Sequence, residues 1–261
     1  MEVFPSKKVE LRDGAILAYV DEGHRHPLVM LHGFSGTAHR HLDSLIDEFR
    51  SDYRVLAPDL RGYGASRPPD RDFPPNFVER DADDVAAFLD SVHCTRAAVL
   101  GFSDGGESAL VLAARRPDLV RGLVVWGAFG QVAPHALRWL ESLLPVDAWG
   151  PDLAQWRESM ILHHGREQWP GLIVSYVECA RALVAAGWNL PLQLAELIKC
   201  PVLQVHGEAE QRANEKEVAR LASVIPRGRL EIIPGADHSV HREQRRLFVS
   251  AVRAFLDDLP E

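Results

Sequence analysis

The chain has 261 residues, of which 46% are hydrophobic and 25% are charged, and its formal net charge at pH 7 is −8. This length and hydrophobicity suffice to bury a large core, so we expect one core domain with an insertion. The acidic balance argues against a nucleic-acid partner, because proteins that bind nucleic acids gather Lys and Arg on one face.

The first half of the chain alternates apolar strands with segments of helical spacing. Strands at 8–11 and 16–20 flank the turn signal Asp13-Gly14, which predicts an opening β-hairpin. Pro27–Leu31 is a continuous apolar run, typical of a strand covered on both faces. The next expected elements are a helix through Leu42, Leu45, Ile46 and Phe49, a strand at 53–57, a helix at 77–92, a strand at 97–100, a helix at 108–114 and a strand at 122–126.

The alternation stops between residues 127 and 199, where the apolar spacing is mostly helical. We therefore predict a helical cap over 131–198, inserted after the sixth strand, and a core formed by 1–130 and 199–261. Strands at 201–205 and 229–233 and helices at 215–224 and 242–256 complete the chain. The order predicts an α/β fold with a mostly parallel eight-stranded sheet and helices on both faces.

The segment Gly101-Phe102-Ser103-Asp104-Gly105 directly follows the strand at 97–100 and fits the Gly-x-Ser-x-Gly nucleophile elbow. A strand that turns straight into a helix places its apex residue in a strained conformation, with glycines on either side because a Cβ would collide with neighbouring backbone. Ser103 is therefore the candidate nucleophile. Taken alone, the pattern is also compatible with a tight turn that holds an incidental serine.

A serine nucleophile needs a base and a group that orients the base. His238 follows the last predicted strand, where a loop can carry an imidazole over the carboxyl edge of the sheet. Glu210 follows the penultimate strand and completes the chain order Ser, acid, His. The competing acids are Glu208, Asp237 and Glu215.

Acyl transfer also needs backbone N–H donors for the developing oxyanion. We expect them at Phe34, directly after His32-Gly33, and at Asp104, directly after the nucleophile. The Asp104 side chain has two interpretations that the sequence leaves open. It either caps local backbone or faces the cleft and favours a cationic substrate.

Other conspicuous residues have both a structural and a functional interpretation. Five of the six tryptophans lie in the predicted cap and serve either as its core or as a surface shared with substrate. His32 is expected to be structural, and the pairs His39/His41 and His163/His164 lack the arrangement of a metal site. Asp81, Asp83 and Asp84 are expected to begin or solvate the helix at 77–92. The substrate-binding candidates are Asp104, Trp126, Trp139, Trp156 and Trp188.

Four motifs in order resemble those of the α/β-hydrolase superfamily: Leu31-His32-Gly33-Phe34, the segment 59–66, the elbow at 101–106, and Gly235-Ala236-Asp237-His238. The segments 100–106, 124–128 and 206–208 are similar to those of the valacyclovir hydrolase (biphenyl hydrolase-like) group. The superfamily resemblance implies a covalent acyl-enzyme without metal or organic cofactor. The narrower resemblance implies small esters, including amino-acid esters. Glu210 departs from the pattern, because similar proteins usually carry Asp there.

We therefore expect a serine esterase that acts on small-molecule carboxylic esters. The rivals are a cofactor-free perhydrolase or haloperoxidase, a carbon–carbon bond hydrolase, and a non-catalytic ligand sensor on the same fold. Three widely spaced cysteines and the absence of a long apolar run predict a cytoplasmic protein without a membrane partner. The sequence leaves the oligomeric state open.

Overall fold

The computed structural model describes residues 7–68 and 70–260, and within them eight strands form one sheet of order β1-β2-β4-β3-β5-β6-β7-β8. β2 runs antiparallel to β1 and β4, and the other neighbours are parallel. The predicted mostly parallel eight-stranded sheet is confirmed. The strands are β1 Lys7–Glu10, β2 Ile16–Gly23, β3 Pro27–Leu31, β4 Arg54–Pro58, β5 Ala97–Phe102, β6 Val120–Trp126, β7 Val202–Gly207 and β8 Gly228–Ile233.

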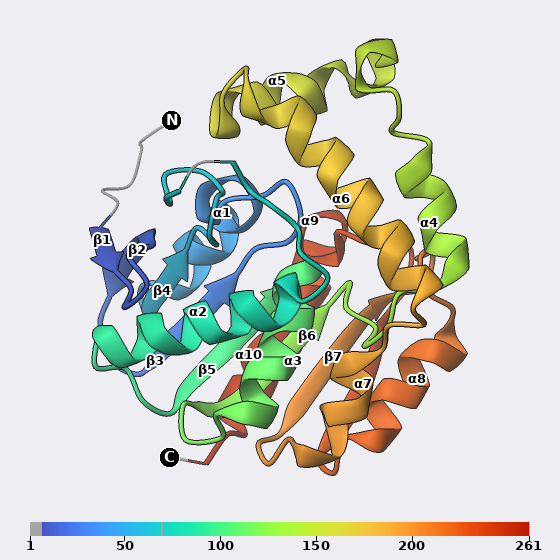
Figure 1. Cartoon of the computed structure of the whole chain (residues 1–261). Helices are drawn as coiled ribbons and strands as arrows, with labels where there is room; N and C mark the ends of the chain where they lie inside the picture. The colour runs from blue at the N-terminus through green and yellow to red at the C-terminus, as the bar shows by residue number, and fades with distance from the viewer. Residues whose placement is uncertain (1–6, 69, 261) are drawn as a thin grey trace.

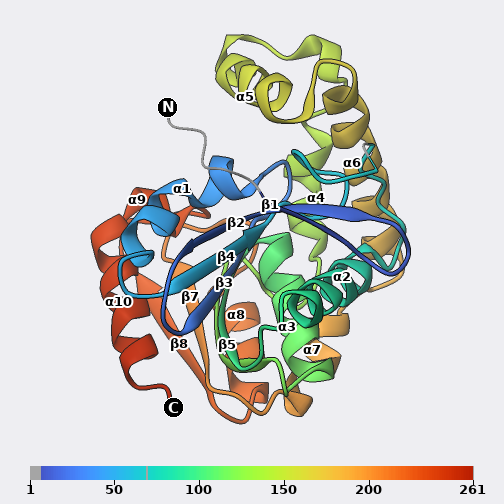
Figure 2. The ribbon, with the colours of Figure 1, turned by 90° about the vertical axis from the view of Figure 1, so that its left-hand side faces the viewer.

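Helices cover both faces of the sheet, as the two views at right angles show (Figures 1 and 2). One face carries α1, α9 and α10, and the other carries α2, α3 and α7. The core helices are α1 Ala38–Phe49, α2 Phe77–Ser91, α3 Asp104–Arg115, α8 Glu215–Val224, α9 Val240–Glu243 and α10 Arg245–Asp257.

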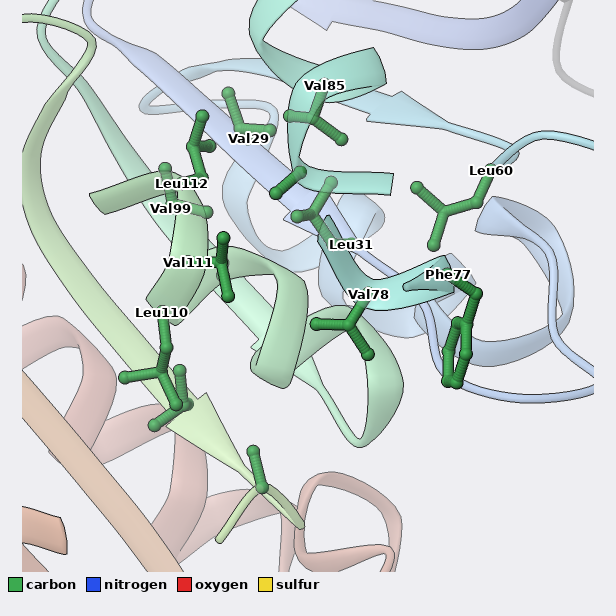
Figure 3. Close-up of a cluster of buried hydrophobic side chains, with 14 of the residues drawn as sticks. Val29, Leu31, Leu60, Phe77, Val78, Val85, Val99, Leu110, Val111 and Leu112 are labelled. Carbon is green, nitrogen blue, oxygen red and sulfur yellow. The ribbon is translucent and has the colours of Figure 1, made fainter. Parts of the chain in front are cut away.

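The two faces hold separate apolar cores because strand side chains alternate in direction. In β3, Val29 and Leu31 join the cluster under α2 and α3, whereas Leu28 and Met30 join the cluster under α1 and α10. Both faces of β3 are thus buried, as its continuous apolar run predicted. Figure 3 shows part of the first cluster, with Val29, Leu31 and Val99 from strands and Val78, Val85, Leu110, Val111 and Leu112 from helices.

The predicted C-terminal helix at 242–256 is interrupted in the structure. Gln244 has φ −128° and ψ 50°, outside the helical region, and separates α9 from α10. The short α9 is anchored by the buried ring of His241, whose Nδ1 accepts a hydrogen bond from Trp126 Nε1 at 2.9 Å. That tautomer leaves the Nε2–H of His241 to donate to the carbonyl oxygen of His41 at 3.1 Å.

The prediction that Asp81, Asp83 and Asp84 begin or solvate a helix is wrong for two of them. The helix begins at Phe77, before all three aspartates, and Asp81 and Asp84 lie on its buried side. Asp81 pairs with Arg71 at 2.6 Å, and both side chains are 1% exposed. Asp84 pairs with the guanidinium of Arg61 at 2.6 Å. Only Asp83 of the three is exposed to solvent.

Helices α4 to α7 lie between β6 and β7, and we call residues 131–198 the inserted segment. Figure 1 shows α4, α5 and α6 beyond one end of the sheet. These elements are α4 Pro134–Glu141, η1 Val146–Ala148, η2 Pro151–Leu153, α5 Ala154–His164, α6 Gln168–Ala185, α7 Leu190–Leu194 and η3 Ala195–Leu197.

Across residues 7–68 and 70–260, no single helix has the length and apolarity needed to cross a membrane. The bent pair Gln168–Ala185 and Leu190–Leu197 meets those criteria together, with 56° between its halves. Apolar residues of this pair belong to the hydrophobic core, among them Leu172, Ile173 and Val177.

Candidate active site

Ser103 occupies the sharp turn between β5 and α3, with φ 54° and ψ −123°. This left-handed φ is strained for a residue with a side chain and persists only where the surroundings enforce it. A Cβ at Gly101 would lie 2.7 Å from the carbonyl oxygen of Gly105, and one at Gly105 would lie 2.4 Å from that of His32. The two glycines therefore allow the close backbone approach that the elbow motif predicted.

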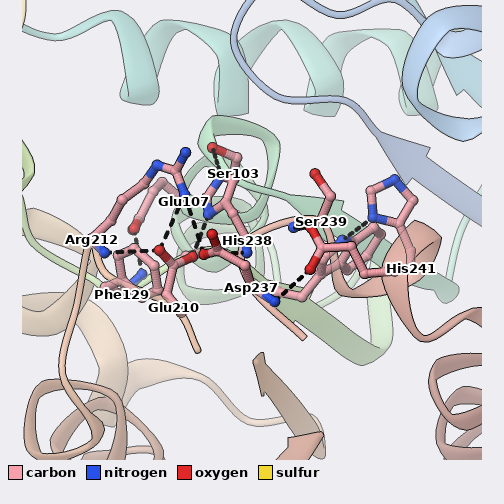
Figure 4. A network of polar contacts seen from close by, with 12 residues as sticks. Ser103, Glu107, Phe129, Glu210, Arg212, Asp237, His238, Ser239 and His241 are labelled. Carbon is pink, nitrogen blue, oxygen red and sulfur yellow. Dashed lines mark hydrogen bonds and ion pairs between the residues drawn. The ribbon is translucent and has the colours of Figure 1, made fainter. Parts of the chain in front are cut away.

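Ser103, His238 and Glu210 lie in one hydrogen-bonded row (Figure 4). His238 Nε2 is 3.2 Å from Ser103 Oγ, and His238 Nδ1 is 2.5 Å from Glu210 Oε2. An ionised carboxylate only accepts hydrogen bonds, so the proton of neutral His238 resides on Nδ1. Nε2 is then free to accept the hydroxyl proton of Ser103.

The competing acids have other positions. Glu208 is exposed and accepts a hydrogen bond from the backbone N–H of Gly235 at 3.1 Å. Asp237 accepts one from the backbone N–H of His238 at 2.7 Å, and Glu215 begins α8. Within the described residues, Glu210 is the carboxylate that contacts the His238 ring.

Glu210 is buried, and its surroundings keep it ionised. Burial favours a higher pKa, but the hydrogen bond from His238 and the contacts with Arg212 lower the pKa of Glu210 to about 2. The Arg212 backbone N–H donates to Glu210 Oε1 at 2.8 Å, and its guanidinium lies 3.2 Å from the same oxygen. One carboxylate oxygen thus binds Arg212 while the other binds the histidine.

The two expected oxyanion donors lie beside the nucleophile in the chain fold. Gly33 approaches so closely that a Cβ there would lie 2.7 Å from Ser103 Cβ, and Phe34 follows it directly. Asp104 is the first residue of α3, where backbone N–H groups have no acceptor within the helix. Whether these amides bind an oxyanion stays a prediction.

A cavity of about 330 Å³ adjoins Ser103 and His238. Asp104, Trp139 and Trp156 line it, as expected of substrate-binding candidates. Trp126 and Trp188 do not line it. Trp126 is fully buried and donates to His241 in α9, and Trp188 packs against the apolar cluster that includes residues of the inserted segment.

Asp104 lines the cavity, and whether its carboxylate binds a cationic substrate stays a prediction. Its Oδ1 accepts a hydrogen bond from the Tyr176 hydroxyl at 2.8 Å, and no described residue partners its Oδ2. Burial raises the pKa of Asp104 to about 6, against the lowering effect of the Tyr176 hydrogen bond. Tyr176 also stacks on Phe34, with 3.8 Å between ring centroids.

Glu107 is a second acidic group in the cavity wall, and its place there was not predicted from the sequence. Its Oε1 accepts hydrogen bonds from the backbone N–H groups of Phe129 at 2.6 Å and Gly130 at 3.0 Å. Burial raises the pKa of Glu107 to about 7, although these backbone hydrogen bonds lower it. The helix predicted at 108–114 begins earlier in the structure, at Asp104, so Glu107 lies on its first turn, four residues after Ser103.

His32 lies outside the hydrogen-bonded row of Ser103, His238 and Glu210 and has structural contacts. His32 accepts a hydrogen bond from the backbone N–H of Leu60 at 2.9 Å, and burial lowers the pKa of His32 to about 3. A neutral, buried His32 is the structural residue that the sequence predicted. The described residues contain no group of three His, Cys, Asp or Glu side chains arranged to hold a metal ion.

The cavity is also lined by residues that were not predicted from the sequence: Arg40, Arg212, Arg242 and Tyr176. Tyr176 belongs to the inserted segment, and nothing in its local sequence separates it from core aromatic residues. The arginines belong to α1, a loop and α9. Charged residues are common at the surface positions of such elements, so they do not stand out in the sequence. Only the folded arrangement brings them to one cavity.

Comparisons with known proteins agree with this geometry. The model of the Alpha/beta hydrolase family matches residues 28–251. The chain belongs to the α/β-hydrolase family. It is 30% identical to the "Serine hydrolase BPHL" of Mus musculus over 242 residues, covering 91% of this chain and 81% of the relative.

Two further similarities are informative. The "2-hydroxymuconate semialdehyde hydrolase" of Pseudomonas sp. (strain CF600) is 30% identical over 261 residues, covering 90% of this chain and 88% of the relative. An esterase structure from Thermogutta terrifontis aligns with a TM-score of 0.75 at 22% identity, covering 97% of this chain and 98% of that one, which shows the shared fold. The relatives of this chain are enzymes. This α/β-hydrolase is a serine hydrolase.

Proposed function

We propose that this serine hydrolase cleaves small carboxylic esters through a covalent acyl-enzyme formed on Ser103. The observation that carries the proposal is the row of Ser103, His238 and Glu210 beside a cavity of about 330 Å³. A cavity of this volume is at the small end of the range for ligand sites and suits small esters. The inserted segment, 131–198, acts as a cap that encloses the substrate.

In the proposed mechanism, His238 Nε2 takes the Ser103 hydroxyl proton while Oγ attacks the ester carbonyl carbon. The backbone N–H groups of Phe34 and Asp104 stabilise the oxyanion. His238 then protonates the leaving alcohol, and the acyl group remains on Ser103. A water molecule, deprotonated by His238, attacks the acyl carbon and releases the acid, which restores Ser103.

Asp104 supports a preference for esters with an ammonium group near the acyl carbon. Asp104 follows the nucleophile, lines the cavity and has one carboxylate oxygen that is buried without a partner among the described residues. A buried carboxylate favours a cationic partner, because the partner offsets the cost of desolvation. Amino-acid esters are therefore the proposed substrate class.

Carbon–carbon bond hydrolysis is the second candidate, and the similarity to the 2-hydroxymuconate semialdehyde hydrolase favours it. The same three residues can serve that reaction, so substrates have to distinguish the two functions. The two functions are distinguished by assaying phenyl esters from acetate to hexanoate beside a conjugated dienoic acid that carries a ketone. We expect turnover of the esters, and cleavage of the ketone alone would replace the esterase proposal.

Replacement of Ser103 by Ala tests the mechanism. We expect kcat/KM for an active ester to fall by about a millionfold, because the residues of such a row act as a unit. Ser108→Ala is the matched control. It removes a buried hydroxyl from α3, the helix that follows Ser103, and this hydroxyl has no hydrogen-bond partner among the described residues. Ester turnover like that of the unmodified enzyme in Ser103→Ala would exclude the acyl-enzyme.

A further inference from the structure

Three arginines line the cavity, and their charges are compensated differently. Arg212 lies 3.2 Å from Glu210 Oε1, so its charge has a carboxylate partner. Arg40, from α1, and Arg242, from α9, form no ion pair with any carboxylate of residues 7–68 and 70–260. The cavity therefore has two guanidinium groups without a counterion in its wall.

The hydrogen bonds of Arg40 all go to neutral groups. Its Nε donates to Ser159 Oγ at 2.6 Å, and its Nη1 donates to the Ser35 carbonyl oxygen at 2.9 Å and to His41 Nε2 at 3.0 Å. Within the described chain, Nη2 of Arg40 has no acceptor and is not sealed from solvent. The Arg242 guanidinium donates to the backbone carbonyl oxygen of Arg40, and the charge of Arg242 is close enough to act on the Arg40 guanidinium.

Two adjacent cations are unfavourable in a partly buried site. Burial and the neighbouring Arg242 lower the pKa of Arg40 to about 10. A bound anion removes both the repulsion and part of the desolvation cost, and the planar guanidinium fork fits the two oxygens of a carboxylate. An anionic group is thus the ligand chemistry that these residues favour.

The position of Arg242 indicates which end of the substrate carries the anion. The leaving alcohol lies against His238, because that ring returns a proton to the alcohol oxygen. Ser239 lines the cavity directly after His238, and α9 begins at the next residue and carries Arg242. Asp104, in contrast, adjoins the nucleophile at the start of α3 and faces the acyl group.

We propose that Arg40 and Arg242 form an anion subsite that binds a carboxylate on the leaving alcohol of the ester. This proposal rests on the proposed ester hydrolysis. It narrows the substrate class to esters with an ammonium group on the acyl side and a carboxylate on the alcohol side.

A matched pair of esters tests the subsite by kinetics. 4-Carboxyphenyl acetate carries the anion on the leaving group, and 4-(methoxycarbonyl)phenyl acetate is its neutral counterpart. We expect Arg40→Gln and Arg242→Gln each to lower the anionic-to-neutral ratio of kcat/KM by about tenfold or more, the loss expected for a hydrogen bond to a charged group. Comparing ratios cancels the intrinsic reactivity of the esters and any general loss of activity.

Arg245→Gln is the control variant. Arg245 is three residues from Arg242 and carries the same charge, but it pairs with Glu48 at 2.8 Å and does not line the cavity. The ratio should stay within twofold of that of the unmodified enzyme. An unchanged ratio in both Arg40→Gln and Arg242→Gln would overturn the subsite. A second pair, monomethyl and dimethyl glutarate, places the anion on the acyl side, and discrimination confined to this pair would overturn the assignment to the alcohol.

A binding experiment separates the subsite from the proposed hydrolysis. In Ser103→Ala protein, calorimetry measures the Kd of 4-hydroxybenzoate and of neutral 4-hydroxybenzamide. We expect the carboxylate to bind more tightly, and Arg242→Gln in this background to weaken it by about tenfold without changing the amide. If no ester is turned over but this difference persists, the function fails and the subsite stands. Equal affinities for both ligands would overturn the subsite.

Discussion

Glu210 contacts both His238 and Arg212, and both contacts affect its charge. Its folded pKa of about 2 lies below the usual value of 4.5, so its contribution to stability is present above about pH 4.5. That contribution is lost as the pH falls through about 2. Glu210 therefore stays ionised across the pH range in which a neutral histidine can act as a base.

Glu210→Gln should reduce kcat by about ten-thousandfold, because an amide no longer fixes the histidine tautomer or stabilises the imidazolium. Hydrolysis of phenyl acetate at pH 8 measures the loss. Glu208→Gln is the control, since Glu208 is exposed and contacts the Gly235 backbone instead of the histidine. Full activity of Glu210→Gln together with an inactive Glu208→Gln would identify the other acid as the partner.

Asp104 has the opposite pKa shift, with a different consequence. Its folded pKa of about 6 lies above the usual value of 3.8, mainly because of burial. The protonated form is favoured in the fold, so the stability that this group contributes is present below about pH 4 and is lost as the pH rises through about 6. An ionised Asp104, able to bind a cation, becomes the main species only above about pH 6.

The preference for amino esters should therefore depend on pH. We expect the kcat/KM ratio of an α-amino ester to its analogue with methyl in place of ammonium to rise between pH 5 and pH 7. The ratio cancels any pH dependence of the catalytic steps that both substrates share. In Asp104→Asn the ratio should be flat and, at pH 7, lower by about tenfold or more. A ratio that rises equally in the variant would assign the pH dependence to another group.

The sequence located the residues whose position follows from the chain order of the fold. Ser103, His238 and Glu210 each lie in the turn or loop that follows a strand, and the carboxyl ends of parallel strands meet at one edge of the sheet. Tyr176 and Arg40 lie within helices, so their approach to the cavity depends on how those helices pack. No local pattern carries that information.

At the scale of elements, α2 contains paired carboxylates on its buried side and a carboxylate on the surface. Asp81 and Arg71 form a fully buried pair with a distance of 2.6 Å, and the Arg71 guanidinium lies 4.9 Å from the Tyr63 ring centroid. Asp83, two residues along the same helix, pairs with Arg115 at 3.4 Å in solvent. The same side chain thus occurs in two environments on one helix.

Asp81→Asn should destabilise the fold by about 3–5 kcal/mol, because it leaves the Arg71 charge buried without a partner. Asp83→Asn should change stability by about 0–1 kcal/mol, as exposed ion pairs contribute little. Urea unfolding followed by circular dichroism measures both. Equal effects in the two variants would mean that burial does not set the value of the Asp81 pair.

The bounds of several elements follow from local sequence, and others do not. β3 and α8 have the predicted limits, since an apolar run and a capping box mark their ends. α2 begins at the predicted residue, but spacing of polar residues did not reveal its buried carboxylates. The break at Gln244 has a tertiary cause, the packing of His241 against Trp126 and His41.

In the whole molecule, the inserted segment contacts the loop that follows β3. His164 Nε2 donates to the Ser35 carbonyl oxygen at 2.9 Å, and its Nδ1 accepts from the Gly64 backbone N–H at 3.3 Å. Trp156 Nε1 donates to Ser35 Oγ at 3.2 Å. Because Ser35 follows the expected oxyanion donor Phe34, these contacts connect the inserted segment to the reaction centre.

His164→Ala should lower kcat/KM for esters by about tenfold, because it removes the two hydrogen bonds of the His164 ring to Ser35 and Gly64 in the core loops. His163→Ala, at the neighbouring position, is the control and should retain near-normal activity. Limited proteolysis should cut the inserted segment faster in His164→Ala alone. Equal cleavage and activity in both variants would show that His164 does not hold the segment against the core.

Four tryptophans form a continuous row from the cavity into the inserted segment. Ring centroids are separated by 6.1 Å between Trp139 and Trp156, by 5.0 Å between Trp156 and Trp149, and by 5.2 Å between Trp149 and Trp169. Excitation energy passes readily between indoles at such separations, and Trp139 and Trp156 form part of the cavity wall. We therefore expect the intrinsic fluorescence of this enzyme to change when a ligand fills the cavity, without any added label.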